Sequence, residues 1–194
     1  MTALIPVVVA GALGRMGAEV IRAVQGAEDC TLVGAIDNTP GKEGCDVGLE
    51  LGLGELEVAV TADFEGCLCA VSQSVRAAEA GAVLVDFTHP SVVYDHTRAS
   101  IAYGVHPVIG TTGLSPEQLN DLTEFSAKAS VGGAVIPNFS VGMVLLQQAA
   151  AAAASFYNHA ELTELHHNRK ADAPSGTCIC LLYTSPSPRD VEES

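Results

Sequence analysis

A glycine-rich segment near the start of the chain has the residue types that bind phosphate. The segment is GALGRMG, Gly11 to Gly17, which follows a short apolar run and opens a helical pattern. Glycines let the backbone approach a pyrophosphate, and the free amides and dipole of a helix start favour negative charge. Asp37 follows about 20 residues later, where a carboxylate can accept both hydroxyls of an adenine ribose. The spacing predicts a dinucleotide site, and a glycine turn in an unrelated α/β domain is the alternative.

A second segment, HHNRKADAPSGT from His166 to Thr177, contains groups suited to proton transfer and carboxylate binding. Imidazoles such as His166 and His167 exchange protons near neutral pH. Lys170 could neutralise a carboxylate or protonate a carbanion, and the backbone amides of Gly176 and Thr177 could hold a second carboxylate. Adjacent histidines on a strand point to opposite faces, which disfavours a shared zinc ion. A surface loop without a role is the alternative.

The charge balance connects these two segments. The chain has 9 basic and 23 acidic residues and a net charge of -14. Three of the few basic residues, Arg15, Arg169 and Lys170, lie inside the two segments. This concentration suggests a dinucleotide at one site and an acidic small molecule at the other. A surface this negative argues against nucleic-acid and membrane-surface binding.

Composition predicts a globular protein of one domain and a fraction of another. The chain has 194 residues, of which 48% are hydrophobic, and no apolar run approaches the ~20 residues of a membrane span. The apolar start lacks the features of a signal peptide, so we expect a cytoplasmic protein. Its six cysteines form no CxxC pair, and the spacing of Cys67 and Cys69 matches no common zinc pattern. We therefore expect no metal site.

Short apolar runs alternate with helical patterns, which predicts a Rossmann-type doubly wound parallel sheet of the α/β class. We interpret residues 38–57, rich in glycine and proline, as a loop. The expected strands are Pro6–Ala10, Thr31–Asp37, Val83–Thr88, Pro107–Gly110 and Ala134–Pro137. The expected helices are Gly14–Val24, Ser91–Tyr103 and Ser115–Ala129.

The sequence pattern changes after Asn138, where we expect a second, smaller domain to start. It opens with an alanine-rich helix, Val141–Phe156, followed by an expected strand, Ala160–Leu165. We predict a dinucleotide-binding domain over residues 1–137 and an incomplete substrate-binding domain over residues 138–179. From residue 180 the sequence CLLYTSPSPRDVEES shows no helical or strand periodicity. It resembles a translated sequencing adapter, so we interpret residues 180–194 as a non-native read-through tail.

Four segments, in this order, resemble the dihydrodipicolinate reductase family. They are GALGRMG, DFTHP at Asp86 to Pro90, GTTG at Gly110 to Gly113, and the pair PNFSVG from Pro137 with ELHHNRKADAPSGT from Glu164. The resemblance implies NADH- or NADPH-dependent reduction of 4-hydroxy-tetrahydrodipicolinate to tetrahydrodipicolinate, in the diaminopimelate route to lysine. It also implies an α+β second domain that binds a cyclic dicarboxylate and assembles a homotetramer. Because we interpret this chain as truncated, we do not expect it to form the homotetramer.

The resemblance also implies roles for individual residues. His166 would be the catalytic proton donor and Lys170 the second donor. Contacts to substrate would come from His167, Ser175, Gly176 and Thr177. Contacts to the cofactor would come from Gly11, Ala12, Leu13, Gly14, Arg15, Met16, Asp37, Gly110, Thr111, Thr112, Ile136, Pro137, Asn138 and Phe139.

Two further expectations concern specificity and activity. Many members of the family have an arginine after the ribose-binding acid, where it can meet a 2'-phosphate, and here that residue is Asn38. NADH is therefore expected to serve at least as well as NADPH. The alternative function is a catalytically inactive dinucleotide-binding fragment, and another Rossmann dehydrogenase acting on an amino or keto acid is a third reading. His89, His96, His106 and His159 are interpreted as ordinary core or surface residues.

Overall fold

A computed structural model describes residues 4–77, 81–136, 138–157, 159 and 161–165. The chain divides into two compact units, Met1–Ile136 and Pro137–Ser194. None of the helices in the described part of the chain is long and apolar enough to cross a membrane.

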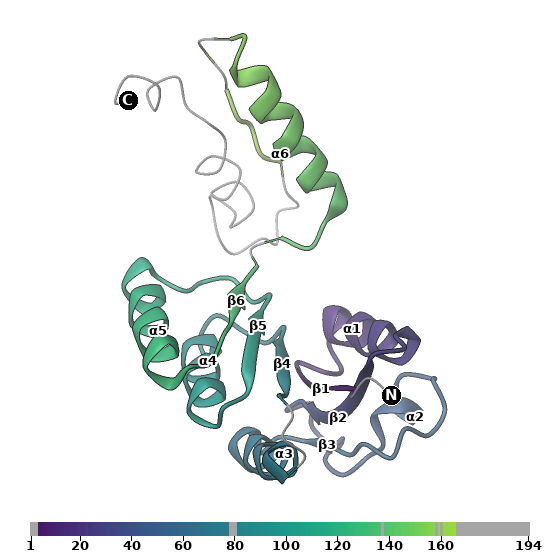
Figure 1. Ribbon diagram of the computed structural model, residues 1–194. Helices are drawn as coiled ribbons and strands as arrows, with labels where there is room; N and C mark the ends of the chain where they lie inside the picture. Colours follow the sequence, from purple (N-terminus) through teal and green to yellow (C-terminus); the bar gives the residue numbers. More distant parts are fainter. Residues whose placement is uncertain (1–3, 78–80, 137, 158, 160, 166–194) are drawn as a thin grey trace. The chain divides into compact units, whose positions relative to one another are not determined.

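The first unit contains a six-stranded sheet in which every strand pairs in parallel. The strand order is β3-β2-β1-β4-β5-β6 (Figure 1). The strands are β1 Ile5–Ala10, β2 Cys30–Ile36, β3 Val60–Thr61, β4 Val83–Asp86, β5 His106–Ile109 and β6 Ala134–Val135. This order reverses direction between β1 and β4, and it confirms the Rossmann-type doubly wound sheet.

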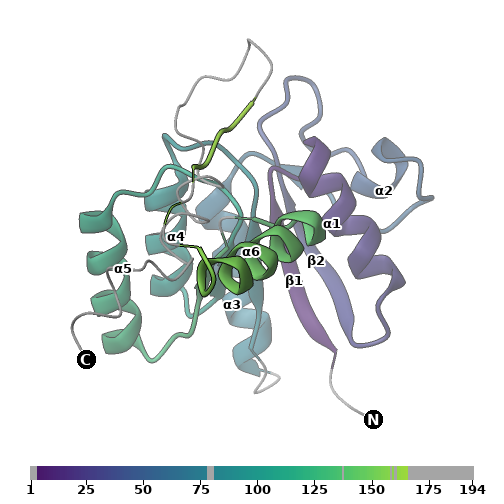
Figure 2. The same cartoon turned by 90° about the horizontal axis from the view of Figure 1, so that it is seen from above.

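The helices of this unit are α1 Arg15–Gly26, α2 Val47–Glu50, α3 Phe64–Ala77, α4 Val93–Ala102 and α5 Pro116–Ala129. Four of them lie beside the strands in two groups. Helices α1 and α2 lie near β1 and β2, whereas α4 and α5 lie near β4, β5 and β6 (Figure 1). The view from above shows the same separation, with α4 and α5 on the side away from α2 (Figure 2).

The packing of the core explains why the strand sequences are continuous apolar runs. Side chains alternate between the two faces of a strand. Val7 and Val9 of β1 belong to one buried cluster with Ile21 of α1. Val8 belongs to a second cluster, with Leu68 of α3. Both faces of the central strand are therefore covered, as double-sided burial requires.

In the first unit, the expected elements agree with the structure to within two residues at each end, but the structure adds three that sequence analysis did not predict. Residues 38–57 are not a continuous loop, because they contain α2. The carboxylate of Asp46 accepts hydrogen bonds from the amides of Leu49, Leu56 and Val58, and so fixes this turn of helix. Helix α3 and the two-residue strand β3 are the other additions.

The second unit contains helix α6, Val141–Ala154. The expected strand Ala160–Leu165 was wrong within the described residues, since Glu161–Leu165 has no regular secondary structure. A strand needs a neighbouring strand to satisfy its backbone groups. The described residues of this unit provide none.

Candidate functional site

The carboxyl ends of β1, β2, β4 and β5 gather the predicted dinucleotide-binding residues at one edge of the sheet. Gly11 follows β1, Asp37 follows β2, and Gly110 follows β5. In doubly wound sheets, ligands bind at this edge where the strand order reverses. Here that position is the junction between β1 and β4, whose last residues, Ala10 and Asp86, are paired.

The glycine segment requires glycine at two positions. Gly11 has a φ of +76°, and a side chain there would place Cβ 2.5 Å from the carbonyl oxygen of Phe87. A Cβ on Gly17 would lie 2.0 Å from the carbonyl oxygen of Gly11. Contacts this short do not occur, so any side chain at either position would force the segment apart. The segment is thus packed closely between the end of β4 and the start of α1.

Helix α1 starts without a side-chain cap. Its N-cap residue is Gly14, which has no side chain to accept a hydrogen bond from the first turn. The first turn contains no acidic residue either. The amides of a helix start seek acceptors and carry partial positive charge. Arg15 is exposed at this turn and forms no ion pair with the residues that the structure describes, which makes the turn suited to an anion.

Asp37 lies beside the glycine segment and is tied to it. Its Oδ2 accepts a hydrogen bond from the amide of Leu13, with N and O 2.8 Å apart. Its Oδ1 accepts from the amide and the hydroxyl of Thr39, at 2.9 and 2.6 Å. A carboxylate offers about four acceptor sites, so one further hydroxyl can still be accepted. The bond to Leu13 fixes the carboxylate next to the glycine segment.

A cleft of about 480 Å³ opens at this edge of the sheet. Gly11, Asp37 and Asn38 line one part of it, and Phe64 and His96 line another. The remaining lining residues are Ile36, Ala62, Thr88, His89, Ser91 and Val92. A flat, partly apolar group with hydroxyls at one end would fit these surroundings, because aromatic and aliphatic side chains lie opposite a carboxylate.

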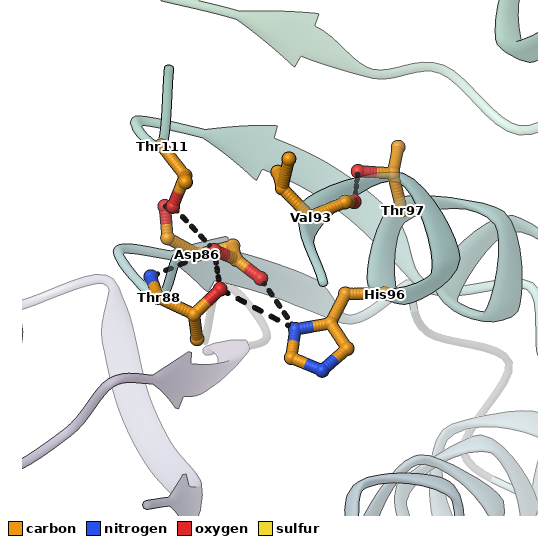
Figure 3. Close-up of polar contacts among 6 residues, drawn as sticks. All are labelled: Asp86, Thr88, Val93, His96, Thr97 and Thr111. Carbon is orange, nitrogen blue, oxygen red and sulfur yellow. Dashed lines mark hydrogen bonds and ion pairs between the residues drawn. The ribbon is translucent and has the colours of Figure 1, made fainter. Parts of the chain in front are cut away.

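A buried carboxylate lies directly behind the cleft. Asp86, the last residue of β4, is fully buried. Its Oδ1 accepts hydrogen bonds from the hydroxyls of Thr111 and Thr88, both at 2.7 Å, and from the amide of Thr88 at 2.9 Å (Figure 3). Its Oδ2 lies 3.0 Å from Nδ1 of His96. Because a carboxylate only accepts, Nδ1 of His96 is the donor.

This network keeps the carboxylate charged. Burial raises the pKa of the Asp86 carboxyl, but hydrogen bonds from His96, Thr111 and Thr88 outweigh burial and hold that pKa below its ordinary value. On its outer side, the ring of His96 stacks on Phe64, with centroids 3.9 Å apart and planes 10° from parallel. The network therefore connects the end of β4 to three residues that line the cleft, Thr88, His96 and Phe64.

The GTTG segment packs against the same strand end. A Cβ on Gly110 would lie 2.2 Å from the ring of Phe87, so only glycine fits there. Thr111 is buried with its hydroxyl on Asp86, whereas Thr112 is exposed. The amide of Ile136 donates to the carbonyl of Ile109, 2.8 Å away.

The structure brings some of the predicted site residues together and not others. The glycine segment, Asp37 and the GTTG segment share one edge of the first unit. Asn138 and Phe139 belong to the second unit. Seven predicted residues lie outside the described residues: Pro137, His166, His167, Lys170, Ser175, Gly176 and Thr177.

Sequence reasoning missed part of this site. His89 and His96, interpreted as ordinary core or surface residues, both line the cleft. Phe64 was missed because α3 was not predicted. A usable signal was present in DFTHP, where an acid ends a buried strand and two hydroxyl or imidazole donors follow. Nδ1 of His106, by contrast, donates to the carbonyl of Gly132, 2.9 Å away, and His106 is not among the residues that line the cleft.

Two family models match the chain. "Dihydrodipicolinate reductase, N-terminus" matches residues 5–139, and "Dihydrodipicolinate reductase, C-terminus" matches residues 142–186. The 4-hydroxy-tetrahydrodipicolinate reductase of Synechococcus sp. strain CC9605 is 93% identical over 179 residues, covering 92% of this chain and 65% of that protein. The same enzyme of Prochlorococcus marinus strain MIT 9313 is 78% identical, covering 91% and 63%. The chain thus spans less than two thirds of these relatives.

Solved structures agree with this similarity. A dipicolinate-bound dihydrodipicolinate reductase from Paenisporosarcina sp. TG-14 matches with a TM-score of 0.67 and 31% identity, over 93% of this chain and 65% of that chain. The WlbA dehydrogenase from Thermus thermophilus, in complex with NAD and α-ketoglutarate, matches with a TM-score of 0.61 over 75% of this chain and 46% of that chain. At 15% identity, the second match indicates a shared fold alone.

Proposed function

The chain belongs to the dihydrodipicolinate reductase family, and from this premise we propose that its first unit binds the nicotinamide dinucleotide of a 4-hydroxy-tetrahydrodipicolinate reductase. The reaction proposed is the NADH- or NADPH-dependent reduction of 4-hydroxy-tetrahydrodipicolinate to tetrahydrodipicolinate, a step towards lysine. Relatives that carry this name cover the described part of the chain at high identity.

One observation carries the proposal. The start of α1 has no side-chain cap, and the carboxylate of Asp37 is bonded to the closely packed glycine segment that precedes it. Gly11 and Gly17 leave no room for side chains, Arg15 has no acidic partner in the described chain, and Asp37 is bonded to Leu13. These residues fit a pyrophosphate at the helix start and a ribose at the carboxylate.

The residues of this chain would divide the cofactor between them. The glycine segment would hold the pyrophosphate, Asp37 the adenine ribose, and the cleft beside Phe64 the adenine. Gly110, Thr111 and Thr112, with residues 136–139, would hold the nicotinamide end. The bound dinucleotide supplies the hydride for the reduction.

We propose that NADH binds at least as well as NADPH. Asn38 carries no charge to attract a 2'-phosphate, and the Asp37 carboxylate would repel one. Lys42, the nearest basic residue after β2 in the sequence, is paired with Glu50. Among the described residues, Arg15 at the start of α1 is the basic residue nearest in sequence to the glycine segment.

The substrate side is proposed from the family alone. His166 would protonate the substrate carbon, with Lys170 as second donor, and His167, Ser175, Gly176 and Thr177 would bind the two carboxylates. Dipicolinate, bound in the Paenisporosarcina relative, has the chemistry of such a cyclic dicarboxylate. A cytoplasmic location and, for the full-length family, a homotetramer complete the proposal.

Titration of NADH and NADPH against the purified chain, followed by the cofactor's own fluorescence or by calorimetry, tests dinucleotide binding. We expect saturable binding, with a Kd for NADH no higher than that for NADPH. A parallel reductase assay tests the reaction: turnover supports the full proposal, and binding without turnover favours a dinucleotide-binding fragment. If the chain binds neither NADH nor NADPH, the assignment of the first unit as a dinucleotide-binding unit is overturned.

A Kd for NADPH well below that for NADH would overturn only the preference. Asn38→Arg is the matched variant, because it adds one cation beside the ribose carboxylate. It is expected to strengthen NADPH binding about tenfold relative to NADH, the effect of one charge-assisted hydrogen bond.

A further inference from the structure

Asp86 is a charged group in a place where a charge is costly to bury. It is fully buried at the end of β4, the strand next to the reversal of strand order. An unpaired carboxylate there would cost several kcal/mol. Four hydrogen bonds from Thr88, Thr111 and His96 compensate for this burial. A fold that needed only packing would place an apolar residue at this position.

The donors come from three separate segments, and each segment borders the cleft or the GTTG turn. Thr88 belongs to the loop between β4 and α4, His96 to α4, and Thr111 to the GTTG turn after β5. Figure 3 shows all three side chains pointing at the one carboxylate. Asp86 is therefore the shared acceptor that sets the spacing of these segments.

The network also reaches the wall of the cleft. Nδ1 of His96 is held by Asp86, which fixes the plane of the imidazole, and the ring stacks on Phe64. Both rings line the cleft. A change in the acceptor would free the imidazole to rotate and would alter the surface that faces a ligand.

We propose that Asp86 is a positioning residue for the dinucleotide site, acting through Thr111 on one side and through His96 on the other. This inference rests on the proposed function, since it concerns the same ligand. Asp86 does not line the cleft, so its contribution to affinity is transmitted by the groups that it holds.

Asp86→Asn is the direct test, because it keeps the shape and replaces one of the two acceptor oxygens by an NH2 group, which donates and cannot accept. We expect the Kd for NADH to rise about tenfold or more, from the loss of hydrogen bonds to a charged group. Thr111→Val, which removes the hydroxyl and keeps the shape, also weakens binding. If Asp86 acts through Thr111, the double variant binds within about threefold of the weaker single variant.

His96 provides an independent pair of variants at the partly exposed end of the network. The amide nitrogen of an asparagine can occupy the position of Nδ1, so His96→Asn retains a donor to Asp86, whereas His96→Leu does not. We expect the Kd of His96→Asn to stay within about threefold of wild type, and that of His96→Leu to rise about tenfold. This pair keeps the proposal testable if Asp86→Asn fails to fold.

Ser100→Ala is the control for a general loss of stability. Ser100 is fully buried in α4, and its hydroxyl donates to the carbonyl of Val105, 2.8 Å away and one residue before β5. This variant should lower the midpoint of urea unfolding without changing the Kd for NADH. A structural role for Asp86 alone would make the two variants alike.

The outcomes separate the two proposals. A wild-type chain that fails to bind NADH overturns the proposed function. A wild-type chain that binds, with Asp86→Asn binding equally well, overturns the positioning role alone. Additive effects of Asp86→Asn and Thr111→Val, or equal losses in the two His96 variants, also contradict it.

Discussion

Helices α1 and α5 begin in opposite ways. At α5, the hydroxyl of Ser115 accepts from the amide of Gln118, and the Gln118 side chain accepts from the amide of Ser115. Pro116 occupies the first helical position and Glu117 adds an acid to the first turn. At α1, the N-cap is glycine, with no side-chain cap and no acid in the first turn.

The difference indicates which helix start has backbone amides available for a ligand. A helix start that only supports the fold satisfies its amides internally, as α5 does, and gains about 1 kcal/mol from its cap. Helix α1 forgoes that gain and leaves its amides for another acceptor. The contrast between two helices of one unit is stronger support for an anion site than a glycine motif alone.

The largest effect should come from filling the space that keeps α1 close to its loop. Gly17→Ala places Cβ 2.0 Å from the carbonyl oxygen of Gly11, so we expect a loss of about 3 kcal/mol in the free energy of unfolding. NADH affinity should fall on the order of 100-fold, because the helix start is displaced from the loop. Urea unfolding and calorimetric titration measure the two effects.

Gly26→Ala is the matched control for this prediction. Gly26 ends the same helix, and a Cβ there meets nothing within 4 Å. Alanine should keep or raise stability, by up to about 1 kcal/mol, and leave NADH binding unchanged. Equal losses in the two variants would contradict the argument from close packing.

The second effect tests the comparison itself by giving α1 the cap that it lacks. Gly14 has extended backbone angles, and a Cβ would lie 3.1 Å from the carbonyl oxygen of Gly11, which a small shift accommodates. Gly14→Asp should change stability by about 0.5 kcal/mol or less, yet weaken NADH binding on the order of 100-fold, since its carboxylate takes the amides and repels phosphate.

Titrations of Gly14→Asp and Gly14→Ala side by side separate charge from size. The alanine variant adds the same Cβ without a cap, so it should lose much less affinity. If both variants lose affinity equally, steric blocking and not the free amides would account for the effect.

The third effect is the converse change at α5. Ser115→Ala removes the cap hydroxyl, and the free energy of unfolding should fall by about 1 kcal/mol. NADH affinity should stay within twofold, because this helix start serves the fold. Urea unfolding detects the loss, and Ser115→Thr, which keeps a hydroxyl, should restore most of it. A large loss of NADH affinity in Ser115→Ala would show that α5 also serves the ligand.

The smallest effect is a local titration at α5. A hydrogen bond from the Ser115 hydroxyl, with a backbone bond, lowers the pKa of the Glu117 carboxyl. A carboxyl with a lowered pKa stabilises the fold above its unfolded pKa of about 4.3, and this contribution is lost as the pH falls through the folded pKa. NMR titration should find the Glu117 pKa below its ordinary range, and Ser115→Ala should raise it. An unchanged pKa in Ser115→Ala would assign the shift to the backbone alone.

Most of the fold could be predicted because its central elements carry their own local pattern. The apolar runs of β1, β2 and β4, and the capping box of α5, are readable without the rest of the chain. Strand β3 is only two residues long and exists because it pairs with Ala35 and Ile36 of β2. Such a short element has no periodicity, so tertiary pairing alone defines it.

Helix α3 could have been found. Leu68, Val71 and Val75 recur at helical spacing and are buried, and the carboxylate of Asp63 accepts from the amide of Gly66 at the start of the helix. Its glycine, serine and cysteine content weakens the helix propensity and hides this signal.

The candidate site also has one part that local sequence predicts and one part that depends on tertiary contacts. The glycine segment and Asp37 are local features at a fixed spacing, so the sequence indicated them directly. The hydrogen bonds to Asp86 join residues 10 and 25 positions away along the chain. No spacing rule links Asp86 to His96 and Thr111. The parallel pairing of β4 with β5 brings the GTTG turn to the end of β4, and His96 reaches the same carboxylate from α4.

The two outer strands of the sheet, β3 and β6, have only two residues each. A long unpaired strand edge is a template on which another chain can add a strand. Edges this short present little such template in the described part of the first unit. Two copies of this unit that met in solution would therefore recognise each other mainly by side-chain surfaces, because β3 and β6 offer little strand edge for pairing.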